Sequence, residues 1–357
     1  MTKLAATLAQ IGDLDRRAMV EAQARLDSLT KPLGSLGVLE TTAVRLAGVT
    51  GQTLVHLGDK AVIVMAGDHG VVEEGVAAYP QAVTMQMLAN FTRGGAGVNV
   101  LARLAGARVV VADLGTAGDA DAEGIIKRKI RYGTGNIARG PAMSREEAVA
   151  AIEAGIEIAQ AEMAKNTAGT CLLATGEMGI GNTTPSSAIL AAFSGFPARA
   201  LAGAGTGLTG EGISRKAEIV QRALAVNKPD PRDGLDVLAK VGGLEIAGLA
   251  GVILAAGAAR VPVLIDGFIS TAAALVAGKI EPRVLNFVFA SHLSTEPGHR
   301  IMLEMMGLKP MLHMEMRLGE GTGAVLAMHL VEAATRIMRE MATFTEAGVF
   351  GPETGAV

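Results

Sequence analysis

Five short apolar segments recur along the chain, and each one breaks into a polar or glycine-rich loop. Segments with the apolar spacing of helices lie between them. A short continuous apolar run is typical of a parallel strand that is buried on both faces. Strands that alternate with helices form a mostly parallel sheet with right-handed crossovers. The pattern predicts an α/β fold, a doubly wound, mostly parallel sheet flanked by helices, with strands at 60–66, 107–112, 170–174, 261–265 and 284–290.

The two ends of the chain have helical patterns and lie outside the strand series. Apolar residues recur at helical spacing over 14–27, and a second helix is expected over 38–48. A third helical segment spans about 324–345. We therefore expect two domains, a large α/β catalytic domain over 58–323 and a small helical domain built from 1–57 plus 324–357.

Three further segments have patterns of their own. Charged and bulky residues alternate over 127–132, which predicts a hairpin at the edge of the sheet. Ser144 and Glu147 match a capping box, so a helix should run from Arg145 to about Lys165. The apolar run 246–259 is shorter than the roughly 20 residues that a membrane span needs. It predicts a buried helix, and no membrane span is expected.

The composition constrains the core. Hydrophobic residues make up 50% of the chain, but aromatic residues only 3%, with no Trp, whereas there are 46 Gly and 17 Met. The core must therefore consist of small and aliphatic side chains in close contact. This favours helices that pack tightly on a sheet.

Charge and cysteine content exclude several classes of function. A net charge of -3 provides no basic surface for nucleic acid, so no nucleic-acid partner is expected. The single cysteine, Cys171, excludes an intrachain disulfide and a cysteine-cluster metal site. Because the N-terminal residues show no signal-peptide pattern, a cytoplasmic location is predicted.

A glycine-rich loop containing an acid follows the third predicted strand. The segment Gly176-Glu177-Met178-Gly179-Ile180-Gly181-Asn182-Thr183-Thr184 comes close to a P-loop, but Asn182 stands where that motif requires Lys. A nucleoside triphosphatase is therefore disfavoured. The loop suits a monophosphate or ribose hydroxyls, because backbone N–H groups before a helix bind anions. The alternative is a turn that is glycine-rich only for tight packing.

A second glycine-rich segment, 205–210, matches a dinucleotide-binding pattern. The residues before it make no convincing strand, so the strand-turn-helix context of that motif is missing. A second phosphate-contacting loop fits better, with Lys216 supplying positive charge. Sequence alone equally allows Lys216 to be a solvated helix residue.

Another acid between glycines is Glu320, in Gly319-Glu320-Gly321. Burial against apolar neighbours would raise its pKa toward the range of a useful base. The alternative is an acid that happens to lie near a helix start.

Tyr79, before a polar and methionine-rich segment, could hold a flat ligand or simply pack in the core. The histidines, His69, His292, His299 and His313, have no metal-site spacing, so structural roles and no metal site are expected.

Taken together, these segments resemble the nicotinate-nucleotide:dimethylbenzimidazole phosphoribosyltransferases, a family of cobalamin nucleotide-loop assembly. The resemblance covers nearly the whole chain, and several independent motifs occur in the right order. They are the segments 29–37, 66–71, 79–81, 176–184, 266–268, 291–292, 296–299 and 318–323. The family fold has a parallel-sheet domain and a small helical domain. The family also implies a homodimer in which the partner helps to complete the site.

The resemblance implies transfer of the 5-phosphoribosyl group from nicotinate mononucleotide to 5,6-dimethylbenzimidazole. The products would be α-ribazole 5'-phosphate and nicotinate, with inversion at the anomeric carbon and no cofactor. Glu320 matches the catalytic glutamate and would act as general base. Family members often carry a serine shortly before the aromatic-Pro pair, whereas Ala77 and Ala78 stand here, which puts a hydroxyl contact to the acceptor base in doubt.

The same match implies three groups of site residues. The catalytic group would be Glu320, Glu177 and Lys216. The group that binds phosphate and ribose would be Gly176, Gly179, Gly181, Asn182, Thr183, Gly203, Gly205 and Gly207. The group that binds the base would be Tyr79, Gln86, Met178 and Leu318.

Two other hypotheses about function stay open from the residues alone. One is a nicotinamide-dependent oxidoreductase that uses 205–210, and the other is a binder of the base or nucleotide without catalysis.

Overall fold

Six parallel strands form the central sheet. The computed structural model describes residues 2–205 and 207–351, and all statements below concern these residues. The strands are β1 Leu57–Gly67, β2 Ala107–Gly115, β3 Ile125–Lys127, β4 Thr170–Met178, β5 Val263–Ile265 and β6 Val288–Ala290. Their order is β3-β2-β1-β4-β5-β6, and each neighbouring pair is parallel. The predicted α/β fold is confirmed.

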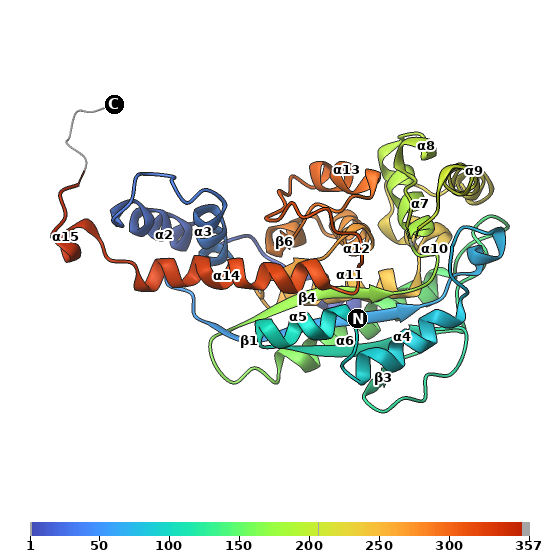
Figure 1. Cartoon of the computed structure of the whole chain (residues 1–357), viewed down its shortest axis with the longest axis horizontal. Coiled ribbons are helices and arrows are strands. Elements are labelled where there is room, and N and C mark those ends of the chain that lie inside the picture. The colour runs from blue at the N-terminus through green and yellow to red at the C-terminus, as the bar shows by residue number, and fades with distance from the viewer. Residues whose placement is uncertain (1, 206, 352–357) are drawn as a thin grey trace.

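Helices cover both faces of this sheet, as a doubly wound fold requires (Figure 1). Side chains alternate along β1, so Val62 lies against the start of α14 while Met65 lies against α11. The helices on the Val62 side are α4 Ala82–Thr92, α5 Gly97–Ala105 and α14 Thr322–Glu340. On the other side α11 Leu244–Ala258 packs on the strands, with α6 Arg145–Met163 and α12 Phe268–Ile280 against it.

The remaining helices form two groups. In the first group α7 Thr183–Ser194, α10 Gly234–Val241 and α13 Pro297–Met305 pack against α12, and α8 Ala198–Leu201 and α9 Gly210–Asn227 pack against α7. At the opposite end of α14 lie α2 Arg16–Ser28 and α3 Val38–Thr50 (Figure 1). Short helices are α1 Lys3–Leu8, α15 Phe344–Ala347 and the 3₁₀ turns η1 Gly70–Glu74 and η2 Pro282–Phe287. None of the helices described is both long and apolar enough to cross a bilayer.

The terminal helices share a small apolar cluster that is separate from the main core. It consists of Ala18, Ala22, Leu26, Leu29, Ala43, Ala47, Ala334 and Met338, from α2, α3, the residue after α2 and the far part of α14. The first helix, α1, packs elsewhere, since the backbone N–H of Leu4 donates to Glu153 of α6 at 2.9 Å. The division into 58–323 and 1–57 plus 324–357 stays a prediction, and residues 352–357 lie outside the described ranges.

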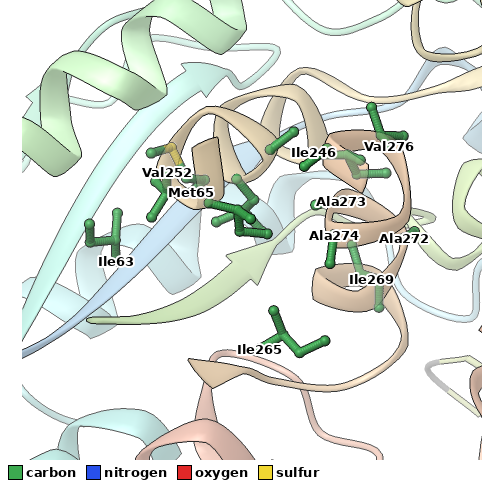
Figure 2. Close-up of a cluster of buried hydrophobic side chains, with 14 of the residues drawn as sticks. Ile63, Met65, Ile246, Val252, Ile265, Ile269, Ala272, Ala273, Ala274 and Val276 are labelled. Atoms are coloured by element: carbon green, nitrogen blue, oxygen red, sulfur yellow. The ribbon is translucent and has the colours of Figure 1, made fainter. Parts of the chain in front are cut away.

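Small and aliphatic side chains fill the core, as the composition predicted. Figure 2 shows Met65 of β1 beside Val252 of α11, and the alanines of α12 in the same buried cluster beside Ile246 of α11. The helices α6 and α11 are in very close contact. A Cβ on Gly155 would lie 1.9 Å from the carbonyl oxygen of Gly248, and one on Gly251 would lie 2.0 Å from that of Ile152. Only glycine lets these two backbones touch.

Two local predictions were wrong. No hairpin forms over 127–132: β3 ends at Lys127 and runs parallel to β2. The amino group of Lys129 instead donates to the carbonyl oxygens of Thr116 and Gly118 at 2.7 and 2.6 Å, which ties this segment to the loop after β2. Within 284–290, the first four residues belong to the turn η2, and only Val288–Ala290 pair in the sheet. Proline at the start of η2 favours a turn there.

The helix predicted from the capping box begins where expected. The Ser144 hydroxyl accepts from the Glu147 N–H at 3.1 Å, and the Glu147 carboxylate accepts from the Ser144 N–H at 2.8 Å. The helix ends at Met163, two residues before the predicted end.

The contact between α6 and α11 generates a stability prediction. Replacing Gly155 by Ala should lower the free energy of unfolding by about 3 kcal/mol or more, because the added methyl must push two helix backbones apart. The control is Gly140→Ala, since a Cβ there meets nothing within 4 Å. Urea denaturation of both variants measures the difference. Equal unfolding midpoints for the two variants would contradict the proposed close packing.

Candidate functional site

Polar side chains gather where four strands end, at one edge of the sheet. Asp68 and Glu177 lie at the carboxyl ends of β1 and β4, and Asp266 and His292 at those of β5 and β6. The strand order reverses between β1 and β4, and open α/β sheets bind ligands at such a switch point. A pocket of about 600 Å³ opens there. Its walls are Tyr79, Val83, Met87, Glu177, Met178, Ile180, Thr183, Gly205, Gly267, Phe268, Ile269, His292, Ser294, Glu296, Arg317, Leu318, Gly319 and Glu320.

Glu320 enters this pocket from a turn of unusual backbone conformation. Gly319, Glu320 and Gly321 have φ values of 85°, 64° and 102°, so three successive residues are left-handed. Glycine adopts this region freely, but glutamate does so only when its surroundings hold it there. The carboxylate is 7% exposed, and its Oε2 accepts from the backbone N–H of Val98 at 3.0 Å.

Burial raises the pKa of Glu320 above its ordinary value of 4.5. The N–H groups of Val98 and Gly97 oppose this increase, and the negative charge of Asp266 adds to it. A carboxylate with a raised pKa is a stronger base than an ordinary one, so the side chain has the chemistry of a proton acceptor.

Glu177 connects the loop after β4 to the turn that carries Glu320. Its Oε2 accepts from the side-chain amide of Asn182, and its Oε1 lies so near Gly319 that a Cβ there would approach to 2.3 Å. Burial raises the pKa of Glu177 to about 8, and the negative charges of Asp266 and Glu245 act in the same direction. At neutral pH this group is therefore mostly a neutral carboxylic acid that can donate a hydrogen bond.

Lys216 is fully buried behind the two glycine-rich segments, which rules out the solvated alternative. Its amino group lies 3.0 Å from both the Thr183 hydroxyl and the Gly203 carbonyl oxygen. Burial lowers the pKa of Lys216 to about 8, although the charge of Glu296 opposes this. The cation thus joins the start of α7 to the 203–205 segment.

Two more charged residues hold that segment. Glu296 accepts from the Gly205 N–H at 2.8 Å, and the guanidinium of Arg317 donates to the Gly205 carbonyl at 3.1 Å. This N–H of Gly205 is therefore engaged by a carboxylate of the same chain. The 205–210 segment, of which Thr206 lies outside the described residues, follows the helix α8. Because a dinucleotide-binding glycine motif follows a strand, this one lacks its structural context.

Apolar side chains form part of the pocket wall. Tyr79, Met178 and Leu318 line it as predicted. Gln86 does not: it is exposed on α4, and the pocket side of that helix carries Val83 and Met87 instead. Position 86 lies three residues after Val83, close to the same helix face, with its side chain open to solvent. The base-binding assignment of Gln86 stays a prediction.

Several predicted phosphate-binding residues are not part of the pocket wall. Thr183 and Gly205 line the pocket, whereas Gly176, Gly179, Gly181, Asn182, Gly203 and Gly207 do not. A Cβ on Gly176 would lie 2.2 Å from the carbonyl oxygen of Glu320, and one on Gly179 would lie 2.3 Å from that of Gly67. For these two glycines the packing alternative accounts for the residue type.

The histidines differ in their surroundings. His69 is buried 2.8 Å from Glu245, which raises its pKa against the effect of burial. His299 is buried 2.8 Å from the Thr271 hydroxyl, and burial lowers its pKa to about 3. His292 lines the pocket, and its Nε2 is 3.6 Å from Asp266. Across the described ranges, three metal-binding side chains do not come together at any point.

Sequence reasoning missed four residues at this site: Asp266, His292, Glu296 and Arg317. Three of them belong to segments that carried the resemblance, and Arg317 immediately precedes another such segment. The position of Asp266 directly after a predicted strand was the available signal. Asp266, Glu296 and Arg317 bond to backbone groups far away in the sequence, such as Gly205 for Glu296, and His292 lies next to Asp266. Spacing along the chain does not reveal such pairs.

Comparisons with known proteins agree with the resemblance. A family model described as Phosphoribosyltransferase matches residues 11–349. The chain is 58% identical over 351 residues to the nicotinate-nucleotide–dimethylbenzimidazole phosphoribosyltransferase of Desulforamulus reducens, covering 98% of this chain and 99% of that protein. It is 57% identical over 350 residues to the protein of the same name from Desulforudis audaxviator, covering 98% of each.

A solved structure supports the same relationship. CobT from Thermus thermophilus superposes with a TM-score of 0.90 at 50% sequence identity, covering 94% of this chain and 100% of that one. A match of this length, with the fold and the pocket described above, leaves one conclusion. The chain is an enzyme that belongs to the phosphoribosyltransferase family.

Proposed function

We propose that this enzyme transfers the 5-phosphoribosyl group of nicotinate mononucleotide to 5,6-dimethylbenzimidazole, a step of cobalamin nucleotide-loop assembly. The names of its relatives state this reaction. The observation that carries the proposal is the pocket itself. It combines a buried carboxylate of raised pKa, Glu320, with an apolar wall that suits a flat heterocycle. A cytoplasmic location stays a prediction.

The phosphoribosyl group would occupy the side of the pocket formed by Thr183 and Gly205. There the Lys216 ammonium lies behind the wall, and the N-terminus of the twelve-residue helix α7 adds a favourable field for an anion. Tyr79, Met178 and Leu318 provide apolar surface for the acceptor base. The predicted contact with Gln86 is not part of this proposal.

Glu320 acts as general base in the proposed mechanism. The ring nitrogen of the benzimidazole attacks the anomeric carbon, and the bond from that carbon to the nicotinate nitrogen breaks. The electron pair of the broken bond neutralises the pyridinium, so nicotinate leaves, and Glu320 takes the proton from the other benzimidazole nitrogen. Attack opposite the leaving group converts the β-linked donor into α-ribazole 5'-phosphate.

Glu177 contributes as a buried neutral acid. With a pKa of about 8 it holds its proton at neutral pH and can donate to a ribose oxygen or a nearby backbone oxygen. Through its contact with Asn182 and its proximity to Gly319, Glu177 connects the loop after β4 to the turn that carries Glu320.

We further propose that the working unit is a homodimer, as the resemblance implies. Tyr79 and Leu318 are 54% and 62% exposed, although they line the pocket. Exposed apolar side chains at the mouth of a site are typical of a surface that another chain covers. The partner would thus close the pocket over the base.

The Glu320→Gln variant tests the base. The amide keeps the shape of the side chain but cannot accept a proton, so kcat should fall about 100-fold or more. Release of nicotinate from nicotinate mononucleotide and dimethylbenzimidazole measures this. For the wild type, kcat/KM should fall as the pH drops through a pKa above 4.5, since the base must be ionised. The control is Glu315→Gln, an exposed acid five residues away. Undiminished turnover in Glu320→Gln would remove the proposed role.

The raised pKa of Glu177 predicts how stability depends on pH. The folded protein holds a proton up to pH about 8 that the unfolded chain releases near 4.5, so stability falls as the pH rises through that window. Glu177→Gln removes this proton. The variant should therefore match the wild type near pH 4.5 and become progressively more stable than it toward pH 8. Thermal midpoints across this range check the prediction, and parallel curves would contradict it.

The dimer has its own test. Sedimentation equilibrium should give about twice the chain mass of 36.4 kDa. If the partner completes the site, specific activity should fall on dilution in step with the monomer fraction. Constant specific activity through dissociation would show that one chain suffices.

A further inference from the structure

Asp266 binds the backbone where the turn containing Glu320 ends and α14 begins. It follows β5 directly and is 1% exposed. Its Oδ2 accepts from the N–H of Gly321 at 3.0 Å, and its Oδ1 accepts from those of Gly323 and Ala324 at 2.7 and 3.0 Å. One carboxylate thus satisfies three backbone donors, of which the first belongs to the residue after Glu320.

The turn needs such an anchor because its conformation is unfavourable for a glutamate. Glu320 has a φ of 64°, and a Cβ on Gly321 would lie 2.6 Å from Val62. A left-handed glutamate persists only where its neighbours determine the backbone. The bond from Gly321 to Asp266 fixes the peptide that immediately follows Glu320.

The side chain of Glu320 is fixed separately. Its Oε2 accepts from Val98 at the start of α5, an element that Asp266 does not bond. Backbone and carboxylate are therefore held by two different elements, β5 and α5. Within the turn, the N–H and hydroxyl of Thr322 also bond to the Gly319 carbonyl at 3.0 and 2.8 Å. Loss of the Asp266 contact would leave the N–H of Gly321 without its acceptor while the carboxylate stays bonded to Val98.

We propose that Asp266 is a positioning residue for the transfer reaction: its hydrogen bonds to Gly321 and to the first turn of α14 hold the end of the 319–321 turn so that the Glu320 carboxylate faces the acceptor base. This rests on the proposed role of Glu320 as general base. Asp266 does not line the pocket, so it acts through Glu320 and not on the substrate.

The charge of Asp266 gives this role a second, measurable effect. The ionisable side chains that line the pocket with Glu320 are Glu177 from the end of β4, His292 after β6, Glu296 before α13 and Arg317 on its own segment. Asp266, after β5, lies outside this lining. From α5 come the backbone N–H groups of Gly97 and Val98. The negative charge of Asp266 raises the pKa of Glu320, so its removal should lower that pKa.

The test is Asp266→Asn, which keeps the size of the side chain. If the amide oxygen stays with Gly323 and Ala324, the amide NH₂ must face the N–H of Gly321, and two donors oppose each other next to Glu320. We expect kcat to fall about 10- to 100-fold, because small displacements of a catalytic group have effects of this size. The KM for nicotinate mononucleotide should change less than about threefold, since the phosphate side of the pocket lies elsewhere.

A matched control is Asp233→Asn, at a partly exposed carboxylate that caps α10 by accepting from Leu235 and Asp236 at 3.0 and 3.2 Å. This variant should lose a little thermal stability and keep its kcat. Asp266→Ser, which has no amide to oppose Gly321, serves if Asp266→Asn does not fold.

Three results decide the proposal. The acid limb of kcat/KM should move to lower pH in Asp266→Asn, a shift that a purely structural role would not produce. In the Glu320→Gln background, Asp266→Asn should cause little further loss, whereas a full multiplicative loss would overturn the proposal. A crystal structure of Asp266→Asn should show residue 320 displaced. An unmoved turn with wild-type kcat would also overturn it.

The same experiments separate this inference from the proposed function. Full activity in Glu320→Gln alone would refute the role of Glu320 as general base, and with it the catalytic part of the inference. The crystal structure of Asp266→Asn would still show whether Asp266 holds the turn in place. Loss of activity in Glu320→Gln with unchanged kinetics in Asp266→Asn would refute only the inference.

Discussion

The pairing of β1 with β4 is the interaction on which the rest of the site depends. These two central strands lie next to each other although β2, β3 and several helices separate them in sequence. Their register sets Met65 opposite Glu177 and Ala66 opposite Met178. Because the strand order reverses between them, the loops that follow β1 and β4 diverge to opposite sides, and the pocket opens in the gap.

Acids and glycines at this site form one structural unit. Each pocket acid has a glycine as its close neighbour: Glu177 at Gly319, Glu296 at Gly203, and the backbone of Glu320 at Gly176. A side chain on any of these glycines would collide with the acid or its backbone. In this structure the glycines are therefore explained by the room that buried carboxylates need. The turn at Gly319-Glu320-Gly321 is the extreme case, since the conformation as well as the space demands glycine on both sides.

Burial of these acids also determines their chemistry. Glu177 and Glu320 lie near Asp266, and each has a pKa above its ordinary value chiefly because it is withdrawn from water. Both acids also receive donors that favour the ionised form: Glu320 from the N–H groups of Val98 and Gly97, and Glu177 from the amide of Asn182 and the N–H of Glu320. Burial outweighs these donors at Glu177 and raises its pKa to about 8. One fold thus presents two carboxyl groups of raised pKa in the same pocket.

Much of this arrangement could be predicted from the sequence because its signals are local. Most strand positions, the capping box at Ser144, and the acid after the strand at 170–174 follow from neighbouring residues. A prediction that needed a distant partner failed. The segment 127–132 formed no hairpin, and Lys129 bonds instead to the loop after β2.

Sequence by itself determined the fold class, the family, and the presence of two glycine-flanked acids, because periodicity and motif order reside in consecutive residues. Only the tertiary structure decided that Lys216 is buried, that Glu296 holds Gly205, and that Asp266 anchors the turn of Glu320. These contacts join segments that are 55 to 91 residues apart in the cases of Asp266 and Glu296. They form only when the parallel sheet brings its strand ends to one edge.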